Sequence, residues 1–142
     1  MDTSTIKIWI AEGDKEVDRL YEYEDDIEKY IVGKRDEWIG WLRHQMKTNP
    51  MFTVMYIEVE GELKGYCIAT KALAYPVSNS IYIFYAHSKL GIEGSKYVWG
   101  EICDWARKLG AAQIEMKTNQ PEFFIRNYSF EVDEFTSLTL RL

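Results

Sequence analysis

The chain has 142 residues, 46% of them hydrophobic and 28% charged, a balance that excludes a disordered or fibrous protein. We expect a single domain spanning residues 1–142, because this length matches the usual size of one globular unit. The net charge of −6 argues against nucleic-acid binding, and the lack of an apolar run of about 18 residues argues against a membrane span.

Residues 1–50 predict one strand followed by two helices. A strand is expected at residues 6–10, where apolar and polar side chains alternate. The first helix should follow Gly13, because apolar residues then recur at roughly helical spacing. These residues are Val17, Leu20, Tyr21, Ile27 and Ile31. The acidic side chains between them predict a solvated face or, alternatively, a lip that attracts a cationic substrate. A second helix over residues 33–48 has an apolar stripe and ends at Asn49-Pro50.

The middle of the chain predicts three strands. Residues 52–59 and 63–73 are rich in β-forming residues and flank Glu60-Gly61, which is a turn signal. These two segments therefore predict an antiparallel hairpin. Residues 80–86 form a nearly continuous apolar run, which is typical of a central strand buried on both faces.

A strand–helix–strand unit is predicted next. A glycine-containing loop at residues 89–95 leads into a helix over residues 92–109, and Gly110 is the expected stop. Together with strands at residues 81–86 and 112–116, this helix forms a βαβ unit. The two strands of such a unit should be parallel.

The end of the chain predicts a short helix and two short strands. The helix opens at Pro121 and runs to about residue 127, and the strands cover residues 130–132 and 136–142. The fold class is therefore α/β (α+β). We expect a mixed, mostly antiparallel central sheet flanked by about four helices, with one parallel βαβ unit.

The cysteines and the N-terminal residues bear on the cellular compartment. Cys67 falls in a predicted strand and Cys103 in a predicted helix, without a CxxC pair or a cysteine–histidine cluster. Reduced thiols are expected, and a metal site is unsupported. Residues 1–14 lack the basic region and apolar core of a signal peptide, which predicts a cytoplasmic protein.

The order of these elements resembles the fold of the GNAT superfamily of N-acetyltransferases. Members of that family place a buried strand before a glycine-rich loop, then a helix ending at glycine, a short strand, an asparagine and a short helix. The matching segments here are residues 81–86, 90–95, the helix to Gly110, 113–116, Asn119, 123–127, Ser129-Phe130 and 138–142. The resemblance implies transfer of an acetyl group from acetyl-CoA to a primary amine of a small molecule or a protein. Family members often pair, so a homodimer is also expected.

The chemistry of such a transfer indicates which residues to consider. A glycine-containing loop that leads into a helix N-terminus offers bare N–H groups to a pyrophosphate. Backbone N–H groups at a splayed strand end, here at Tyr85 or Ala86, can stabilise the thioester oxygen as it gains charge. The CoA-binding residues implied by the resemblance are Tyr85, Ala86, Lys89, Gly91, Gly94, Ser95, Lys96 and Asn119.

Proton transfer completes the reaction, because the amine must lose a proton and the leaving thiolate must gain one. Glu58, on a predicted strand, and His87, just past the central strand, are the candidate bases. At the position of Ile125 the family commonly carries a tyrosine that acts as the general acid. Tyr128 is the candidate that could replace it.

Departures from the family pattern keep other functions open. The loop places Ile92 or Glu93, depending on the register, where the family has glycine, and Ser129 replaces another glycine. These changes also fit a catalytically inactive binding or assembly protein with the GNAT fold, for which a viral origin is one option. An unrelated α+β ligand-binding domain is the third interpretation.

Overall fold

The computed structural model describes residues 2–23, 27–29, 31, 33–74, 78–118, 121–132, 138 and 140–142, with backbone only for residues 72–74 and 78. Its elements are η1 (Thr3–Thr5), β1 (Ile6–Ile10), η2 (Asp14–Glu22), η3 (Ile27–Lys29), α1 (Arg35–Thr48), β2 (Phe52–Val59), β3 (Glu62–Ala74), β4 (Ser78–Ser88), α2 (Ile92–Lys108), β5 (Gln113–Met116) and α3 (Pro121–Tyr128), where η denotes a 3₁₀ helix. No helix among these residues is long and apolar enough to cross a membrane.

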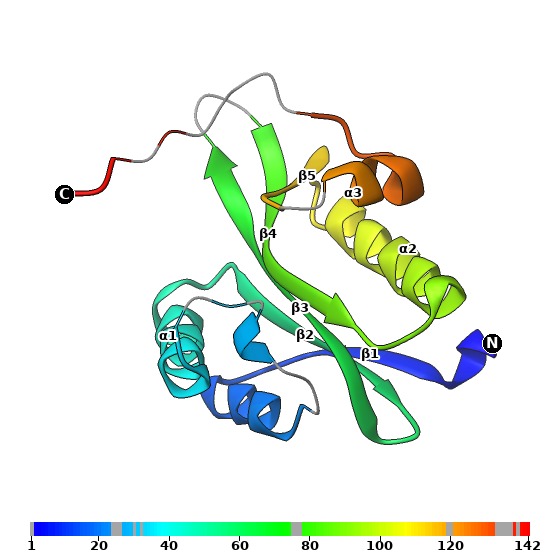
Figure 1. The fold of residues 1–142 in the computed structure, drawn as a ribbon, viewed down its shortest axis with the longest axis horizontal. Helices are drawn as coiled ribbons and strands as arrows, with labels where there is room; N and C mark the ends of the chain where they lie inside the picture. The colour runs from blue at the N-terminus through cyan, green and yellow to red at the C-terminus, as the bar shows by residue number, and fades with distance from the viewer. Residues whose placement is uncertain are drawn as a thin grey trace.

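The five strands form one sheet in chain order, β1-β2-β3-β4-β5. The neighbours β1/β2, β2/β3 and β3/β4 are antiparallel, whereas β4 and β5 are parallel. Helix α2 makes the crossover between β4 and β5, and it covers one side of the sheet while α1 lies on the other (Figure 1). The predicted mixed α/β class and the parallel βαβ unit are confirmed.

Local backbone features fix how β2, β3 and β4 meet. The β2–β3 turn has positive φ at both Glu60 (53°) and Gly61 (80°), the geometry that suits a two-residue hairpin. A Cβ at Gly65 of β3 would lie 2.6 Å from the carbonyl oxygen of His87, so only glycine allows this approach to β4. A bulge follows in β4, because Ile68 pairs with Tyr85 whereas Ala69 pairs with Ile83.

The sheet separates two different cores. We call the side covered by η2, η3 and α1 the aromatic face, because Tyr23, Tyr56, Tyr66 and Trp38 are buried there. We call the side covered by α2 the aliphatic face. Its buried residues are Ile6, Met55, Ile57, Cys67, Ala69, Ile81, Ile83, Val98, Ile102 and Ala106. Cys67 and Cys103 are both free, as expected.

The first predicted helix is wrong in type. The described residues form the 3₁₀ helices η2 and η3 instead of one α-helix. The reason is a spacing of three, which matches the 3.0 residues per turn of a 3₁₀ helix. Val17, Leu20 and Tyr23 follow that spacing and all three are buried. Tyr21, which the α-helical interpretation placed on the apolar stripe, is 45% exposed.

The predicted C-terminal strands are not formed by the described residues. Residues 130–132, 138 and 140–142 are outside any strand, while residues 133–137 and 139 lie outside the described part of the chain. Phe130 instead packs against Trp99 of α2, with ring centroids 5.5 Å apart. Leu138 and Leu140 are 89% and 84% exposed, so their alternating pattern has no apolar surface to cover.

Candidate active site

The two parallel strands separate partway along their length. Strands β4 and β5 pair from Ser80 opposite Gln113 to Ile83 opposite Met116, and β4 then continues to Ser88 alongside β3 alone. In the described part of the chain, residues 84–88 of β4 therefore have no strand partner on their β5 side. Tyr85 and Ala86 lie in this stretch. Backbone N–H groups on such an edge can donate hydrogen bonds to an oxygen that gains negative charge.

The N-terminus of α2 lies just beyond the end of β4 (Figure 1). Gly91 is the N-cap residue, and it contributes no side-chain hydrogen bond to the first helical turn. Gly94 is buried in that turn, whereas Glu93 and Lys96 are exposed to solvent. The first-turn N–H groups and the positive end of the helix dipole therefore form a cradle of the kind that can bind phosphate groups, beside the acidic side chain of Glu93 in the same turn.

Local hydrogen bonds hold the loop that forms this cradle. The Ser95 hydroxyl donates to the carbonyl oxygen of Leu90 at 3.1 Å and lies 3.2 Å from the Ser88 hydroxyl. The Leu90 N–H donates to the Ser88 hydroxyl at 3.1 Å. Ser95 therefore orders the connection from β4 to α2. Asn119, the last of the implied CoA-binding residues, lies outside the described residues.

His87 and Tyr23 meet at the end of β4. The Tyr23 hydroxyl lies 2.6 Å from Nδ1 of His87, and the two rings contact edge to face with centroids 5.7 Å apart. The Nζ of Lys89 lies 4.5 Å from the centroid of the Tyr23 ring. Tyr23 was not identified from the sequence as a site residue. The signal that could have found it is the three-residue spacing from Val17 and Leu20.

Glu58, the other candidate base, is engaged by two partners. Its Oε1 accepts a hydrogen bond from the Trp9 indole at 2.7 Å and forms an ion pair with Arg19. The Arg19 guanidinium also lies over the Trp9 ring, 5.4 Å from its centroid. Glu58 is on β2, two strands from β4, which is about 10 Å at the usual strand spacing. The structure does not bring Glu58 and His87 together.

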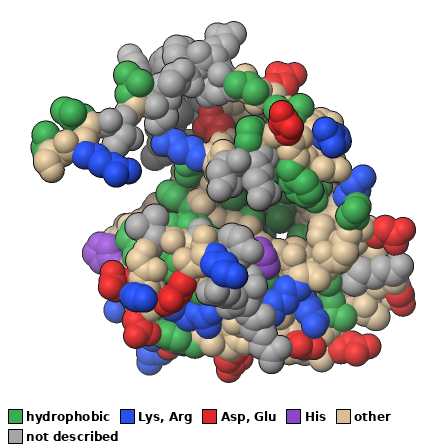
Figure 2. Space-filling view, viewed as in Figure 1, with side chains coloured by type: hydrophobic (Ala, Val, Ile, Leu, Met, Phe, Trp, Pro, Cys, Tyr) green, Lys and Arg blue, Asp and Glu red, His purple; other side chains and the backbone are tan. Residues whose placement is uncertain are grey.

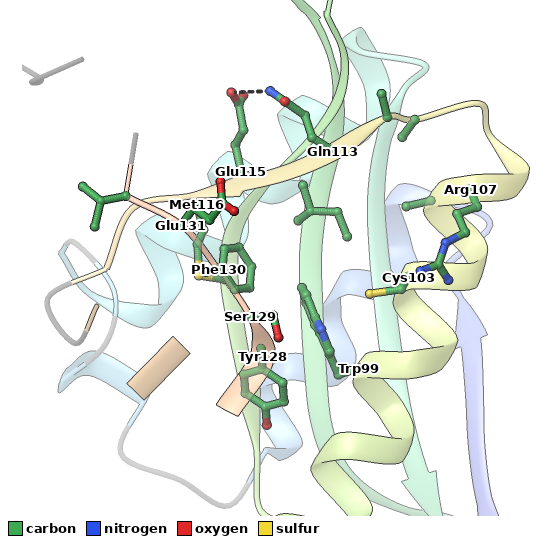
Figure 3. A pocket seen from close by; sticks show the side chains of 15 residues that line it. Trp99, Cys103, Arg107, Gln113, Glu115, Met116, Tyr128, Ser129, Phe130 and Glu131 are labelled. Atoms are coloured by element: carbon green, nitrogen blue, oxygen red, sulfur yellow. Dashed lines mark hydrogen bonds between the residues drawn. The ribbon is translucent and has the colours of Figure 1, made fainter. Parts of the chain in front are cut away.

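Tyr128 belongs to a different part of the molecule. Its ring packs against Trp99 of α2, with centroids 5.5 Å apart, and burial raises the pKa of its hydroxyl. Both rings line a cavity of about 790 Å³ between α2, β5 and residues 128–132. Figure 3 shows the Tyr128 ring beside Trp99, with its hydroxyl turned away from Phe130. This cavity is on the α2 side of β5, whereas the His87 side chain packs with the aromatic face.

A wall of aromatic rings lines the other side of β4 and was also not identified as part of a site. Trp38 contacts Tyr85 edge to face, with ring centroids 5.5 Å apart, and the ring centroids of Trp41 and Phe84 are also 5.5 Å apart. Trp41 is 36% exposed, so the wall is not fully covered. Figure 2 shows the molecule hollowed near its centre, between the half that holds α1 and the half that holds α2 and α3, with hydrophobic side chains at the floor.

Comparisons with known proteins bear on the fold of the chain. No protein-family model and no curated protein matches the sequence. Among solved structures, a probable acetyltransferase is similar with a TM-score of 0.74 and 14% identity, over 96% of this chain and 98% of that one. An aminoglycoside N-acetyltransferase in complex with CoA is similar with a TM-score of 0.72 and 10% identity, over 96% of this chain and 94% of that one.

A third solved structure is the ribosomal-protein-alanine N-acetyltransferase of Brucella melitensis. Its TM-score is 0.69 at 12% identity, and the similarity covers 96% of this chain and 99% of that one. Identity at this level shows the fold, and the fold is the same in all three comparisons. The chain therefore has the fold of the GNAT acetyltransferases.

Proposed function

We propose that this chain, acting as one domain of residues 1–142, is an acyl-CoA-dependent N-acetyltransferase. It transfers the acetyl group of acetyl-CoA to a primary amine of a small molecule or a protein. The observation that carries this proposal is the separation of β4 from β5 after Ile83, directly beside the uncapped N-terminus of α2. The similar structures include enzymes solved with CoA, which supports the same conclusion.

The two halves of acetyl-CoA would meet different features. The first turn of α2, from Gly91 to Gly94, would hold the pyrophosphate through N–H groups and the helix dipole. The free edge of β4 at Tyr85 and Ala86 would donate a hydrogen bond to the thioester oxygen. Glu93 is compatible with this arrangement, because the residue is exposed and its carboxylate has room to turn away from a bound pyrophosphate.

The acceptor amine would approach from the aromatic face. The partly exposed rings there, including Trp41, provide a surface that favours a cationic or apolar group. Of the three candidate catalytic side chains, His87 lies on the free stretch of β4, so we place it at the reacting centre. Tyr128 would line the α2 side, and Glu58 would support the fold through its ion pair with Arg19 without entering the reaction. We also propose a cytoplasmic protein that forms a homodimer.

Calorimetric titration of acetyl-CoA into the protein tests the proposal. We expect saturable binding, which Gly91→Asp should weaken at least about 10-fold, because the new carboxylate would cap the first turn and repel the pyrophosphate. A Cβ at Gly91 meets no atom within 4 Å, so the fold should tolerate the change.

Gly100→Asp is the matched control, because it adds the same charge to the same helix at a position that is equally open. It should leave the affinity unchanged. Absence of binding at millimolar acetyl-CoA would exclude the acetyltransferase and favour an inactive binding or assembly protein. Equal weakening by both variants would show that charge alone, and not the α2 N-terminus, controls the binding.

A further inference from the structure

Glu115 of β5 is held by two neutral donors. The Ser80 hydroxyl donates to its Oε2 at 3.1 Å, and the Gln113 amide donates to its Oε1 at 2.9 Å. Ser80 is 0% exposed, so the first of these donors has a fixed position. Figure 3 shows the Glu115 and Gln113 side chains pointing away from Trp99 and Tyr128. An ionised carboxylate can accept about four hydrogen bonds, so Glu115 can take further donors from a ligand.

The strand alternation places Glu115 on the same side of the sheet as the aromatic wall. Ile81 and Ile83 belong to the aliphatic core, so Tyr82 between them points to the aromatic face. Glu115 pairs with Tyr82, and residues paired across neighbouring strands point to the same face. The Tyr82 ring contacts that of Phe84 edge to face, with centroids 5.0 Å apart. The carboxylate therefore lies at one end of the aromatic wall.

The carboxylate and the neighbouring ring together suit a cation. Burial raises the pKa of the Tyr82 hydroxyl, and the charge of Glu115 raises it further, so the ring stays neutral beside that charge. Aromatic rings attract cations, and a carboxylate forms charge-assisted hydrogen bonds with ammonium groups. Neither Ser80 nor Gln113 brings a positive charge that would offset the negative one. Glu115 is only partly buried, so a ligand in solution can reach it.

The position of Glu115 relative to the proposed reacting centre sets the length of the acceptor. Tyr82, which pairs with Glu115, lies three residues before Tyr85 on β4. This separation is about 10 Å, at about 3.3 Å per residue of strand. The aromatic wall follows the same stretch, because Phe84 and Tyr85 both pack on that face. One amino group cannot occupy both ends, whereas an extended molecule with two amino groups can follow the wall between them.

We propose that Glu115 is a specificity-determining residue that binds a second ammonium group of the acceptor, so that the preferred substrate is an extended diamine. This inference rests on the proposed acetyltransferase function. One amino group attacks the thioester carbon beside Tyr85, where β4 has separated from β5. A C–N bond forms, the C–S bond breaks with its electron pair on sulfur, and the proton that the nitrogen loses balances the proton that the thiolate gains. The other amino group stays protonated at Glu115 and does not react.

A matched pair of acceptors tests the second charge. Diaminooctane and octylamine have the same carbon chain and the same reacting group, and they differ in one terminal ammonium. We expect the wild-type chain to have the lower KM for diaminooctane. Glu115→Gln is isosteric and removes only the charge, so it should raise the KM for diaminooctane about 10-fold. The KM for octylamine and both kcat values should stay within about 2-fold of the original values.

Glu101→Gln is the control, because it removes the same charge from an exposed position on α2, on the other side of the sheet. It should leave the KM of both amines unchanged. Equal KM values for the two amines in the wild-type chain would overturn the proposal. Parallel increases for both amines in Glu115→Gln, or an equal increase for diaminooctane in Glu101→Gln, would overturn it too.

Calorimetric titration of diaminooctane separates this inference from the proposed function. If the wild-type chain transfers no acetyl group to any amine, the proposed function fails. Diaminooctane binding that Glu115→Gln weakens about 10-fold, and that Glu101→Gln does not weaken, would still support a cation site at Glu115. Absence of diaminooctane binding, or equal binding by the wild-type chain and Glu115→Gln, would overturn that site.

Discussion

The two faces of the sheet bury apolar surface in similar ways but differ in their polar groups. The aliphatic face packs Ile81, Ile83 and Cys67 against α2, without polar side-chain partners in its described core. The aromatic face buries tyrosine and tryptophan rings, and the hydroxyls of Tyr23 and Tyr56 find specific partners there, whereas the buried indole nitrogen of Trp38 has none among the described residues. For example, the Tyr56 hydroxyl donates to the Glu16 carbonyl at 2.8 Å. The difference teaches that one face is scaffold, and that the other holds hydroxyl, imidazole and carboxylate groups at defined positions.

A matched pair of core truncations gives the largest expected effect on this comparison. Ile81 on the aliphatic face and Ile68 on the aromatic face are each 0% exposed. Ile81→Ala and Ile68→Ala should both lower the free energy of unfolding by about 3 kcal/mol, because each leaves a cavity. Chemical denaturation measures this loss. At a temperature where both variants are folded, only Ile68→Ala should shift the His87 NMR signals, since Ile68 pairs with Tyr85 on β4.

Equal shifts of the His87 signals in both variants would contradict the conclusion that the aliphatic face is scaffold and that the aromatic face positions the polar groups. The adjacent pair Val54 and Met55 offers a control, because both residues lie on β2, which β3 separates from β4, and on opposite faces. Their alanine variants should lose stability without moving His87. That result would show that the shift reports a local contact and not a general loss of packing.

Glu58→Gln has a smaller expected effect and tests whether the ion pair on the aromatic face contributes to stability or to catalysis. The Glu58 and Arg19 side chains are 13% and 23% exposed, so their ion pair is partly buried. Glutamine can still accept from the Trp9 indole but leaves Arg19 without its charged partner. We expect a loss of about 1–2 kcal/mol in the free energy of unfolding. Acetyl transfer should continue at nearly the original rate.

The double-mutant cycle with Arg19→Met isolates the ion pair from the loss of stacking on Trp9. A coupling energy near zero would show that the pair contributes nothing to stability. A fall in kcat of about 100-fold or more for Glu58→Gln, with stability preserved, would instead make Glu58 a general base. That outcome would assign catalysis to a residue two strands away from β4.

The sequence predicted the scaffold better than the site, for physical reasons. Apolar periodicity and turn residues are local signals, and they were enough for the hairpin, for α2 with its stop at Gly110, and for the parallel pair β4/β5. The contact between Tyr23 and His87 joins residues 64 positions apart, and no local pattern encodes it. The 3₁₀ helix was missed because periods of 3.0 and 3.6 differ little over a short segment.

The C-terminal expectation failed for a related reason. Alternating leucines predict a strand only if the sheet offers an edge and an apolar surface to cover. Among the described residues, Leu138 and Leu140 contact neither a sheet edge nor an apolar surface, because both are almost fully exposed. The family pattern around Ser129 and Phe130 was more informative, because it reflects backbone geometry and a ring contact that the structure contains.

Ser129→Gly gives the smallest expected effect and tests that backbone geometry directly. Ser129 follows α3 with φ of 59°, in the left-handed region where a side chain is strained and glycine is not. Glycine should relieve about 1 kcal/mol of strain but also makes the unfolded chain more flexible, so we expect a net gain of about 0.5 kcal/mol in thermal or chemical denaturation. Ser129→Ala keeps the Cβ and should give no gain. If glycine destabilises the protein, the serine hydroxyl contributes more than the strain costs. Position 129 would then match the family's glycine only by its place in the sequence, and the backbone there would not require glycine.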